Sequence, residues 1–358
     1  MEMKNVLWQR TPGDCPGAPE SQPWPTAAPG EVGLDPVQLD SLAARIAGGE
    51  IPGIHSVLIV RDGKLAFERY FAGDDALWAF PLGRVTFGPE TMHDVRSVSK
   101  SVVGALVGIA HGESALPDLD APLASLFPDY AKGRESDLAG RTLRHALTMT
   151  AGLSWDELTH PYWDPRNDEH GMWAAADPLE YALSRKPIAA PGERFAYNGG
   201  LPTVLAAAVE RTTGKSLDRW AREKLWGPIG VTRTEWLQHE SGLFVAASGL
   251  RLRPRDMARF GQLMLDDGRW AGRQVVPASY ARESLTEQVK TGSAFMPPGY
   301  GYQWWIAGLP AASGNGGQRI LVSKPGRMVV VMTGGLYDSP QQGPAPMKVM
   351  EGILRAAS

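Results

Sequence analysis

Residues 97–110 read SVSKSVVGALVGIA, and this stretch decides the fold of the chain. Its larger apolar residues recur at helical spacing: Val98, Val102, Ala105, Leu106 and Ile109. The opposite side is also apolar or glycine, and a helix that is apolar nearly all round is typical of the centre of a domain. We therefore expect a buried central helix with Ser97 in its first turn and Lys100 on the same face.

The first turn of this helix combines three groups that acyl transfer requires. Ser97 supplies a hydroxyl, Lys100 supplies an amine, and the helix N-terminus supplies free backbone N–H groups. The alternative is that Ser97 only caps the helix, since Ser-x-x-Lys is short enough to occur by chance. Two facts favour chemistry. No other serine is followed three residues later by lysine, and burying a lysine without a role is costly.

The composition is that of a globular protein of about two domains. The chain has 358 residues, of which 43% are hydrophobic and 21% are charged. The formal net charge of -3 gives no reason to expect nucleic acid or an anionic membrane as a partner. No stretch reaches the roughly 18 apolar residues of a membrane span. Residues 1–10 lack the apolar core of a signal peptide, so we expect a cytoplasmic location, and the single Cys15 excludes an internal disulfide.

The pattern of elements predicts an arm and two domains. Residues 1–33 are rich in proline and glycine and are expected to form an extended arm. Two strand-like runs flank Asp62-Gly63, which indicates a hairpin ahead of the Ser97 helix. Between residues 113 and 283 helical segments alternate with turns, which predicts an all-helical domain. Strand-like runs return after residue 284 and are followed by a closing helix.

Both ends of the chain are therefore expected to share one sheet domain. Hairpins rather than βαβ units imply an antiparallel sheet. The predicted fold class is α+β, with an antiparallel sheet flanked by helices and built from residues 34–112 and 284–358. The helical domain, residues 113–283, is inserted between these two parts.

Four segments resemble motifs of the serine hydrolases of the β-lactamase and penicillin-binding-protein superfamily, which includes class C-like esterases and 6-aminohexanoate-dimer hydrolases. Residues 93–101, HDVRSVSKS, resemble the first motif, and residues 191–200, PGERFAYNGG, resemble the second. Residues 311–318, AASGNGGQ, resemble the third, and residues 147–153, LTMTAGL, resemble a supporting structural motif. The resemblance runs from about Gly33 to the end and implies the same two-domain fold.

The resemblance also implies roles for particular residues. Ser97 would be the acylated nucleophile, and Lys100 and Tyr197 would share the movement of its proton. Which of the two is the base stays open. A neutral Lys100 needs a pKa near 7, about 3 below its usual value, and a tyrosinate beside a lysine ammonium is the coupled alternative. The N–H of Ser97 and one near Asn315 would hold the oxyanion. Further expected binding residues are Gly314, Asn198 and Trp155.

Two departures from the family pattern bear on the substrate. The second motif is usually Tyr-x-Asn in lactam-recognising members, but here its third position is Gly199. The third motif usually begins with lysine or histidine, and the matching position, aligned on Gly314, is Ala312. We therefore expect simple esters or small linear amides to be better substrates than penicillins, although Arg319 could supply the missing cation.

The sequence leaves two alternative functions open. One is a β-lactamase or DD-peptidase, and the other, from a different class, is a catalytically silent binding module on the same fold. A Gly-x-Ser-x-Gly elbow, a His-Glu-x-x-His zinc motif and phosphate-binding glycine loops are missing from the sequence. The seven histidines show no ligand spacing, so neither a metal nor a cofactor is predicted. The expected partner is a small-molecule ester or amide, and the sequence allows a homodimer.

Overall fold

The computed structural model describes residues 9–16, 24–78 and 80–357. Its centre is an antiparallel sheet of eight strands in the order β11-β12-β13-β14-β15-β16-β2-β3. The strands from the C-terminal part are β11 (Val289–Lys290), β12 (Gly299–Tyr300), β13 (Trp305–Ala307), β14 (Leu309–Gly314), β15 (Gln318–Ser323) and β16 (Met328–Gly334). The strands from the N-terminal part are β2 (Ile54–Arg61) and β3 (Lys64–Tyr70). Because β16 pairs with β2, the two parts of the chain share one sheet, as predicted.

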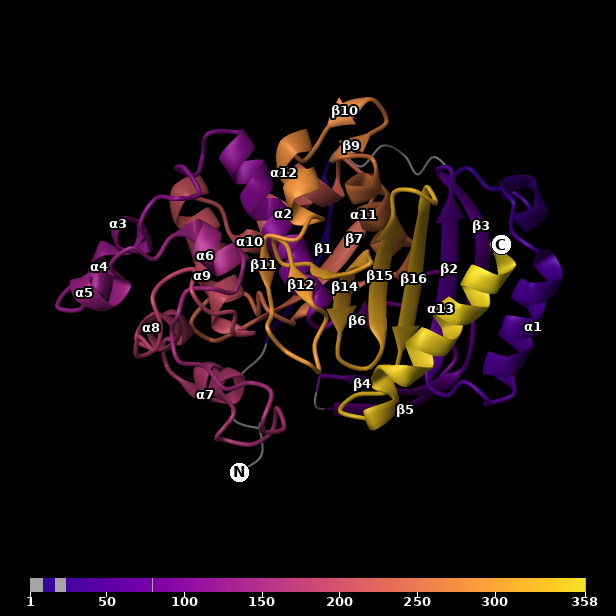
Figure 1. Ribbon diagram of the computed structural model, residues 1–358, viewed down its shortest axis with the longest axis horizontal. Helices are drawn as coiled ribbons and strands as arrows, with labels where there is room; N and C mark the ends of the chain where they lie inside the picture. Colours follow the sequence, from indigo (N-terminus) through magenta and orange to yellow (C-terminus); the bar gives the residue numbers. More distant parts are fainter. Residues whose placement is uncertain (1–8, 17–23, 79, 358) are drawn as a thin grey trace.

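Helices cover both faces of this sheet (Figure 1). On one face, α1 (Pro36–Ala47) and α13 (Pro344–Ala356) bury the side chains of Val57, Ile59, Val330 and Met332. The alternating residues Leu58, Val60, Val329 and Val331 belong to a second core, which includes α2 (Val98–Gly112) and α11 (Pro254–Leu265). The alternation follows from the pleat of a strand, which sends successive side chains to opposite faces.

The helices between α2 and α11 form the other half of the molecule (Figure 1). The longest is α9 (Gly200–Thr213), which packs against α2, α6 and α8. The shorter ones are α3 (Leu123–Leu126), α4 (Pro128–Ala131), α5 (Glu135–Leu138), α6 (Leu143–Leu147), α7 (Asp168–Ala174), α8 (Pro178–Leu183) and α10 (Leu217–Ala221). After α11 follows α12 (Ala278–Ser284). As predicted, α2 is buried along nearly its whole length.

The region from 113 to 283 also contains strands that the sequence analysis did not predict. The strands β7 (Arg233–Gln238) and β8 (Leu250–Leu252) form a second sheet in the order β1-β7-β8-β6. Its outer strands are β1 (Gln9–Asp14), which lies in the predicted extended arm, and β6 (His93–Asp94). A small hairpin is formed by β9 (Arg269–Trp270) and β10 (Arg273–Gln274). These strands are short or pair with residues far away in the chain, so local patterns do not reveal them.

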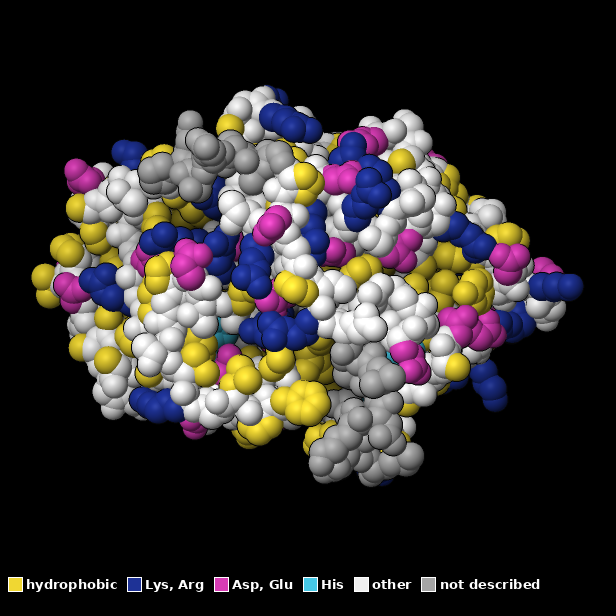
Figure 2. Space-filling view, turned by 180° about the vertical axis from the view of Figure 1, so that it is seen from behind, with side chains coloured by type: hydrophobic (Ala, Val, Ile, Leu, Met, Phe, Trp, Pro, Cys, Tyr) yellow, Lys and Arg dark blue, Asp and Glu magenta, His cyan; other side chains and the backbone are white. Residues whose placement is uncertain are grey.

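A further hairpin of β4 (Gly73–Leu77) and β5 (Phe80–Val85) lies below the main sheet in Figure 1. Among the described residues, none of the helices combines the length and apolar character needed to cross a bilayer. In the view of Figure 2, acidic and basic side chains lie interspersed over the surface, in keeping with a net charge of -3.

Candidate active site

Ser97 lies at the N-terminus of α2, in a tight turn that follows β6. Arg96 has a φ of 51°, in the left-handed region that is unfavourable for a residue with a side chain. The turn is closed by the N–H of Val98 donating to Val95 O at 3.2 Å and that of Ser99 donating to Arg96 O at 2.8 Å. Strained turns of this kind often display functional groups. The Ser97 side chain therefore faces the cleft, which it lines.

Lys100 and Tyr197 lie beside this hydroxyl. Lys100 Nζ donates to Ser97 Oγ at 3.1 Å and to the carbonyl of Ala247 at 3.3 Å. The ammonium lies 4.8 Å from the centre of the Tyr197 ring, and the phenol interacts with both Ser97 and Lys100 through its hydroxyl. The Lys100 side chain is 1% exposed. The structure thus brings together the three residues that the resemblance assigned to catalysis.

Two buried carboxyl groups complete this cluster, and the sequence analysis did not identify them. Glu157 Oε1 lies 3.7 Å from Lys100 Nζ. Its other oxygen, Oε2, accepts hydrogen bonds from the N–H of Gly199 at 2.5 Å and from Trp155 Nε1 at 2.8 Å. Glu169 hydrogen-bonds with Glu157 and accepts a bond from Ser248 Oγ at 2.8 Å. Lys100 is therefore in contact with an acidic pair.

The acidic pair sets the charge of the catalytic cluster. Burial raises the pKa of Glu157 to about 8, the Lys100 ammonium lowers it, and the neighbouring Glu169 raises it further. The raised pKa favours the protonated form of Glu157 at neutral pH. Burial alone would lower the pKa of Lys100, but its interactions with Tyr197, Glu157 and Glu169 outweigh burial and raise it. This balance favours a Lys100 ammonium over a neutral amine in the resting enzyme.

Tyr197 is held as a neutral phenol in the resting enzyme. Burial raises the pKa of its hydroxyl, whereas Lys100 lowers it and Glu157 raises it. Its ring stacks on Trp305 with the centroids 5.2 Å apart. Because Lys100 and Tyr197 are in contact and both buried, their protons must be treated as those of one titrating unit.

The third motif forms the opposite wall of the site, on β14. A side chain at Gly314 would place its Cβ 2.3 Å from Val95 O, so glycine allows β14 to lie against the turn that carries Ser97. Ser313 lines the cleft, whereas Ala312 points into the core and is 1% exposed. The side chain of Asn315 is bonded to the loop that follows β16, because its Nδ2 donates to Asp338 Oδ1 at 2.7 Å. Asn315 therefore connects this wall of the cleft to that loop.

Two of the expected binding residues act on their neighbours instead. Asn198 Oδ1 accepts the N–H groups of Gly200 at 2.7 Å and Leu201 at 3.2 Å, so its side chain caps the start of α9. Trp155 donates to Glu157 and contacts Tyr181 edge to face, with ring centroids 6.1 Å apart. The structure thus places both behind the catalytic cluster.

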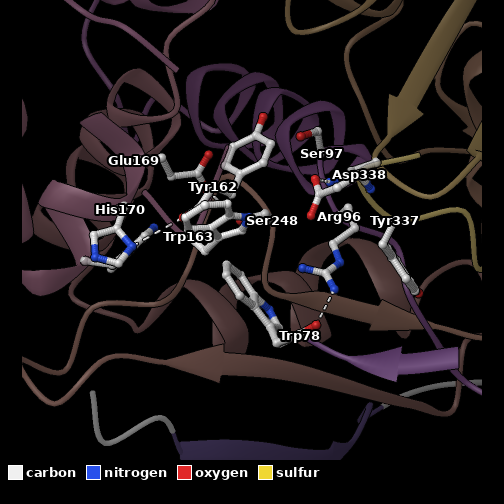
Figure 3. Close-up of a pocket in the computed structure, with 12 residues that line it drawn as sticks. Trp78, Arg96, Ser97, Tyr162, Trp163, Glu169, His170, Ser248, Tyr337 and Asp338 are labelled. Atoms are coloured by element: carbon white, nitrogen blue, oxygen red, sulfur yellow. Dashed lines mark hydrogen bonds between the residues drawn. The ribbon is translucent and has the colours of Figure 1, made fainter. Parts of the chain in front are cut away.

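The cleft has two lobes that meet at Ser97. One is a cavity of about 390 Å³, whose aromatic walls are Trp78, Tyr162, Trp163, Trp173 and Tyr337 (Figure 3). The other, of about 530 Å³, is lined by Tyr197, Trp305 and Arg319 among others. Arg319 donates only to the carbonyl groups of Gly314, Gln318 and Gln342 in the part of the chain that the structure describes. Burial lowers its pKa to about 10, so the guanidinium still carries its charge at neutral pH.

Comparisons with known proteins show the family to which the chain belongs. Residues 39–346 match the family model described as Beta-lactamase. The 6-aminohexanoate-dimer hydrolase of Paenarthrobacter ureafaciens is 29% identical over 296 residues, which cover 76% of this chain and 70% of that protein. A monacolin J acid methylbutanoyltransferase of Aspergillus terreus is 28% identical over 214 residues, and this match covers 55% of the chain and 51% of that enzyme. The chain thus spans about half the length of this second relative.

Solved structures show the same fold. A structure from Bacillus anthracis assigned to the 6-aminohexanoate-dimer hydrolases has a TM-score of 0.75 at 22% identity, covering 96% of this chain and 90% of that one. A family VIII carboxylesterase has a TM-score of 0.68 at 15% identity, covering 93% and 98%. The chain belongs to the beta-lactamase family and is a serine hydrolase of that fold, which confirms the resemblance read from its motifs.

Proposed function

We propose that this serine hydrolase cleaves carboxylic esters or small linear amides through an acyl-enzyme on Ser97. The observation that carries the proposal is the contact of Lys100 Nζ with Ser97 Oγ at 3.1 Å, beside the hydroxyl of Tyr197. A serine held by a buried, coupled acid–base pair is the arrangement of an activated nucleophile. A silent binding module has no chemical reason to bury these groups together.

The proposed reaction has two halves. Ser97 Oγ attacks the carbonyl carbon, and its proton passes to the Lys100–Tyr197 pair, which then protonates the leaving alcohol or amine. A water molecule attacks the resulting ester, the pair takes the proton of that water, and Ser97 regains its hydrogen as the acid product leaves. The resting charges favour proton transfer through Tyr197, with the Lys100 ammonium stabilising the phenolate as it forms.

The oxyanion of each tetrahedral intermediate needs donors that are otherwise free. Neither the N–H of Ser97 nor that of Asn315 donates to another described residue, and both residues line the same cleft. Backbone N–H groups so placed stabilise the charge that develops on the carbonyl oxygen. We assign the oxyanion site to these two groups.

The shape of the cleft favours an extended substrate rather than a fused ring system. The aromatic cavity suits an apolar or aromatic part of the substrate, while the lobe with Arg319 suits a polar or anionic end. One relative, the 6-aminohexanoate-dimer hydrolase, is named for a linear substrate of this kind. The alternative function is that of a β-lactamase or DD-peptidase. The cytoplasmic location, the two domain boundaries and a possible homodimer stay predictions.

Labelling with a serine-reactive fluorophosphonate tests the assignment of the nucleophile. We expect stoichiometric modification of the wild-type chain and, after proteolysis, a label on the peptide that contains Ser97. Ser101, on the same helix, should remain unlabelled, because it is buried and donates to Gln303 O at 2.6 Å. Labelling of any other serine, or none in a folded protein, would contradict the proposal.

A further inference from the structure

Two histidines and an aspartate meet in the core, on three different strands of the N-terminal part of the chain. They are His55 on β2, Asp75 on β4 and His93 on β6, and one ligand atom of each lies within 4.8 Å of the others. Their exposures are 1%, 7% and 0%. The cluster is separate from Lys100 and Tyr197, and the proposed hydrolysis does not use it. The sequence analysis found no ligand spacing here because only the fold brings these residues together.

The two imidazoles are poorly satisfied for buried histidines. Nδ1 of His93 has no hydrogen-bond partner among the described residues, and neither nitrogen of His55 makes a hydrogen bond of normal geometry, although the backbone of Asp74 interacts with its ring. A buried polar atom without a partner destabilises a protein, so such atoms call for an explanation. Phe87 stacks on His55 at 4.1 Å and on His93 at 4.5 Å between ring centroids, which holds both rings without offering an acceptor.

From this geometry we infer that His55, His93 and Asp75 bind a divalent transition-metal ion such as Zn²⁺. Two imidazoles and one carboxylate are a donor set that Zn²⁺ takes in proteins, with a fourth position left to water. The atoms must approach one another, since a tetrahedral Zn²⁺ with bonds of about 2.0–2.1 Å holds its ligands about 3.4 Å apart. From the present separations of up to 4.8 Å, this is a movement of at most about 1.4 Å, which rotations of the three side chains can supply.

The groups around the cluster already orient its donors. Nε2 of His93 lies 3.2 Å from Thr333 Oγ1, so a proton on Nε2 would leave the Nδ1 lone pair free for the metal. The hydroxyl of Tyr337 donates to Asp75 Oδ1 at 2.9 Å. Such partners of metal ligands fix the ring tautomer and the direction of the carboxylate. Glycine at position 73 leaves room for the ring, because a Cβ there would lie 2.6 Å from His55 Nε2.

The position of the ion would make it a structural support for the active site. His93 lies four residues before Ser97 in the chain, and Tyr337, which is bonded to Asp75, lines the aromatic cavity. A metal at this point would join β2, β4 and β6 beneath the cavity wall. The ion takes no part in the acyl transfer, so its role can be tested without measuring hydrolysis.

The test measures metal binding by the full chain, prepared without a histidine tag and stripped with a chelator. We expect one Zn²⁺ per chain after dialysis, and a higher Tm with Zn²⁺ than without it. His93→Phe keeps an aromatic ring but removes the donor, and it should lose at least about 100-fold in affinity. His111→Phe is the matched control, because His111 lies outside the cluster, with Nδ1 3.2 Å from Pro117 O. It should bind as the wild type does.

A second measurement covers the case in which His93→Phe does not fold. Co²⁺ added to the stripped wild-type chain should give the intense visible absorption of a tetrahedral site. A folded, stripped wild type that binds neither Zn²⁺ nor Co²⁺ at micromolar concentration would overturn the inference. So would wild-type affinity in a folded His93→Phe, or only the weak spectrum of octahedral, surface-bound Co²⁺. These outcomes do not depend on whether the enzyme is active.

Discussion

The backbone of Gly199 and the carboxyl group of Glu157 are in direct contact. The N–H of Gly199 donates to Glu157 Oε2 at 2.5 Å, and a Cβ on Gly199 would lie 2.9 Å from that same oxygen. Glycine at the third position of the second motif thus leaves room for a carboxyl group from a distant loop. A larger side chain there would press on the acidic pair beside Lys100.

Replacing Gly199 with alanine should therefore weaken the protein. The added methyl group would press on Glu157 and Glu169, whose oxygens lie 2.9 and 3.0 Å from the new Cβ and are held by buried hydrogen bonds. We expect a loss of about 1–3 kcal/mol in the free energy of unfolding, as for other overpacked sites. Urea denaturation measures it. Gly88→Ala is the control, since nothing lies within 4 Å of a Cβ there, and equal stabilities for the two variants would contradict the packing argument.

Ser97→Ala should abolish hydrolysis of a short-chain p-nitrophenyl ester while the fold is kept. The covalent route disappears with the hydroxyl, so kcat/KM should fall by about 10³-fold or more. Circular dichroism checks that the variant is folded. Turnover close to that of the wild type would show that another residue is the nucleophile.

Lys100→Ala and Tyr197→Phe should each lower kcat by about 10²–10⁴-fold, the usual range for a general acid–base group. Because the two groups form one proton-transfer unit, the double variant should be little worse than the more damaging single one. The measurement is kcat for all four proteins at one pH. Losses that multiply fully would mean that the two residues act independently.

The raised pKa of Glu157 predicts a pH-dependent stability. Its value of about 8 in the folded protein lies above the usual 4.5, so the stabilising contribution of the protonated form is complete below pH 4.5 and is lost as the pH rises through 8. Glu157→Gln imitates the protonated form. The Tm of this variant relative to that of the wild type should therefore rise between pH 4.5 and pH 8. Glu240→Gln, at an exposed carboxyl, should show no such trend, and parallel curves for all three proteins would refute the assignment.

Nitrocefin should be a much poorer substrate than p-nitrophenyl butyrate. The cation that opens the third motif in lactam-recognising relatives is replaced by the buried Ala312, and the asparagine of the second motif is replaced by Gly199. A charge-assisted hydrogen bond contributes about 1.5–3 kcal/mol and a neutral one about 1. The loss of both contacts should therefore lower kcat/KM for nitrocefin by a factor of several hundred. The measurement is kcat/KM for both compounds. A value for nitrocefin equal to that for the ester would favour the β-lactamase alternative and assign the carboxylate contact to Arg319.

The sequence predicts those parts of the site that are local in the chain. Ser97 and Lys100 are three residues apart on one helix, and the apolar run behind them makes that helix visible. Tyr197 was found only through the resemblance of its motif. Glu157, in a loop, and Glu169, in the first turn of α7, gave no signal, because acidic residues normally face water and only the fold reveals that these two are buried. The one indirect sign was Gly199, where an expected side chain is missing.

The same distinction applies to the fold. The hairpin of β2 and β3 follows from Asp62-Gly63 between apolar runs, and its register is set within a few residues. In contrast, β7 lies between β8, which follows it after a loop, and β1, which comes from the other end of the described chain. Such pairings depend on tertiary packing, which overrides local preference.

The pairing of β2 with β16 also determines when this protein can fold. Val57 is opposite Met332 in the sheet, with most of the chain between them. During synthesis, β2 and β3 leave the ribosome as a hairpin, and the edge of β2 that pairs with β16 has no partner strand until the last strands arrive. Contacts so distant in the chain make folding slow and leave such edges open to aggregation. Until residue 334 has emerged, this edge is therefore free to pair with the strands of other chains.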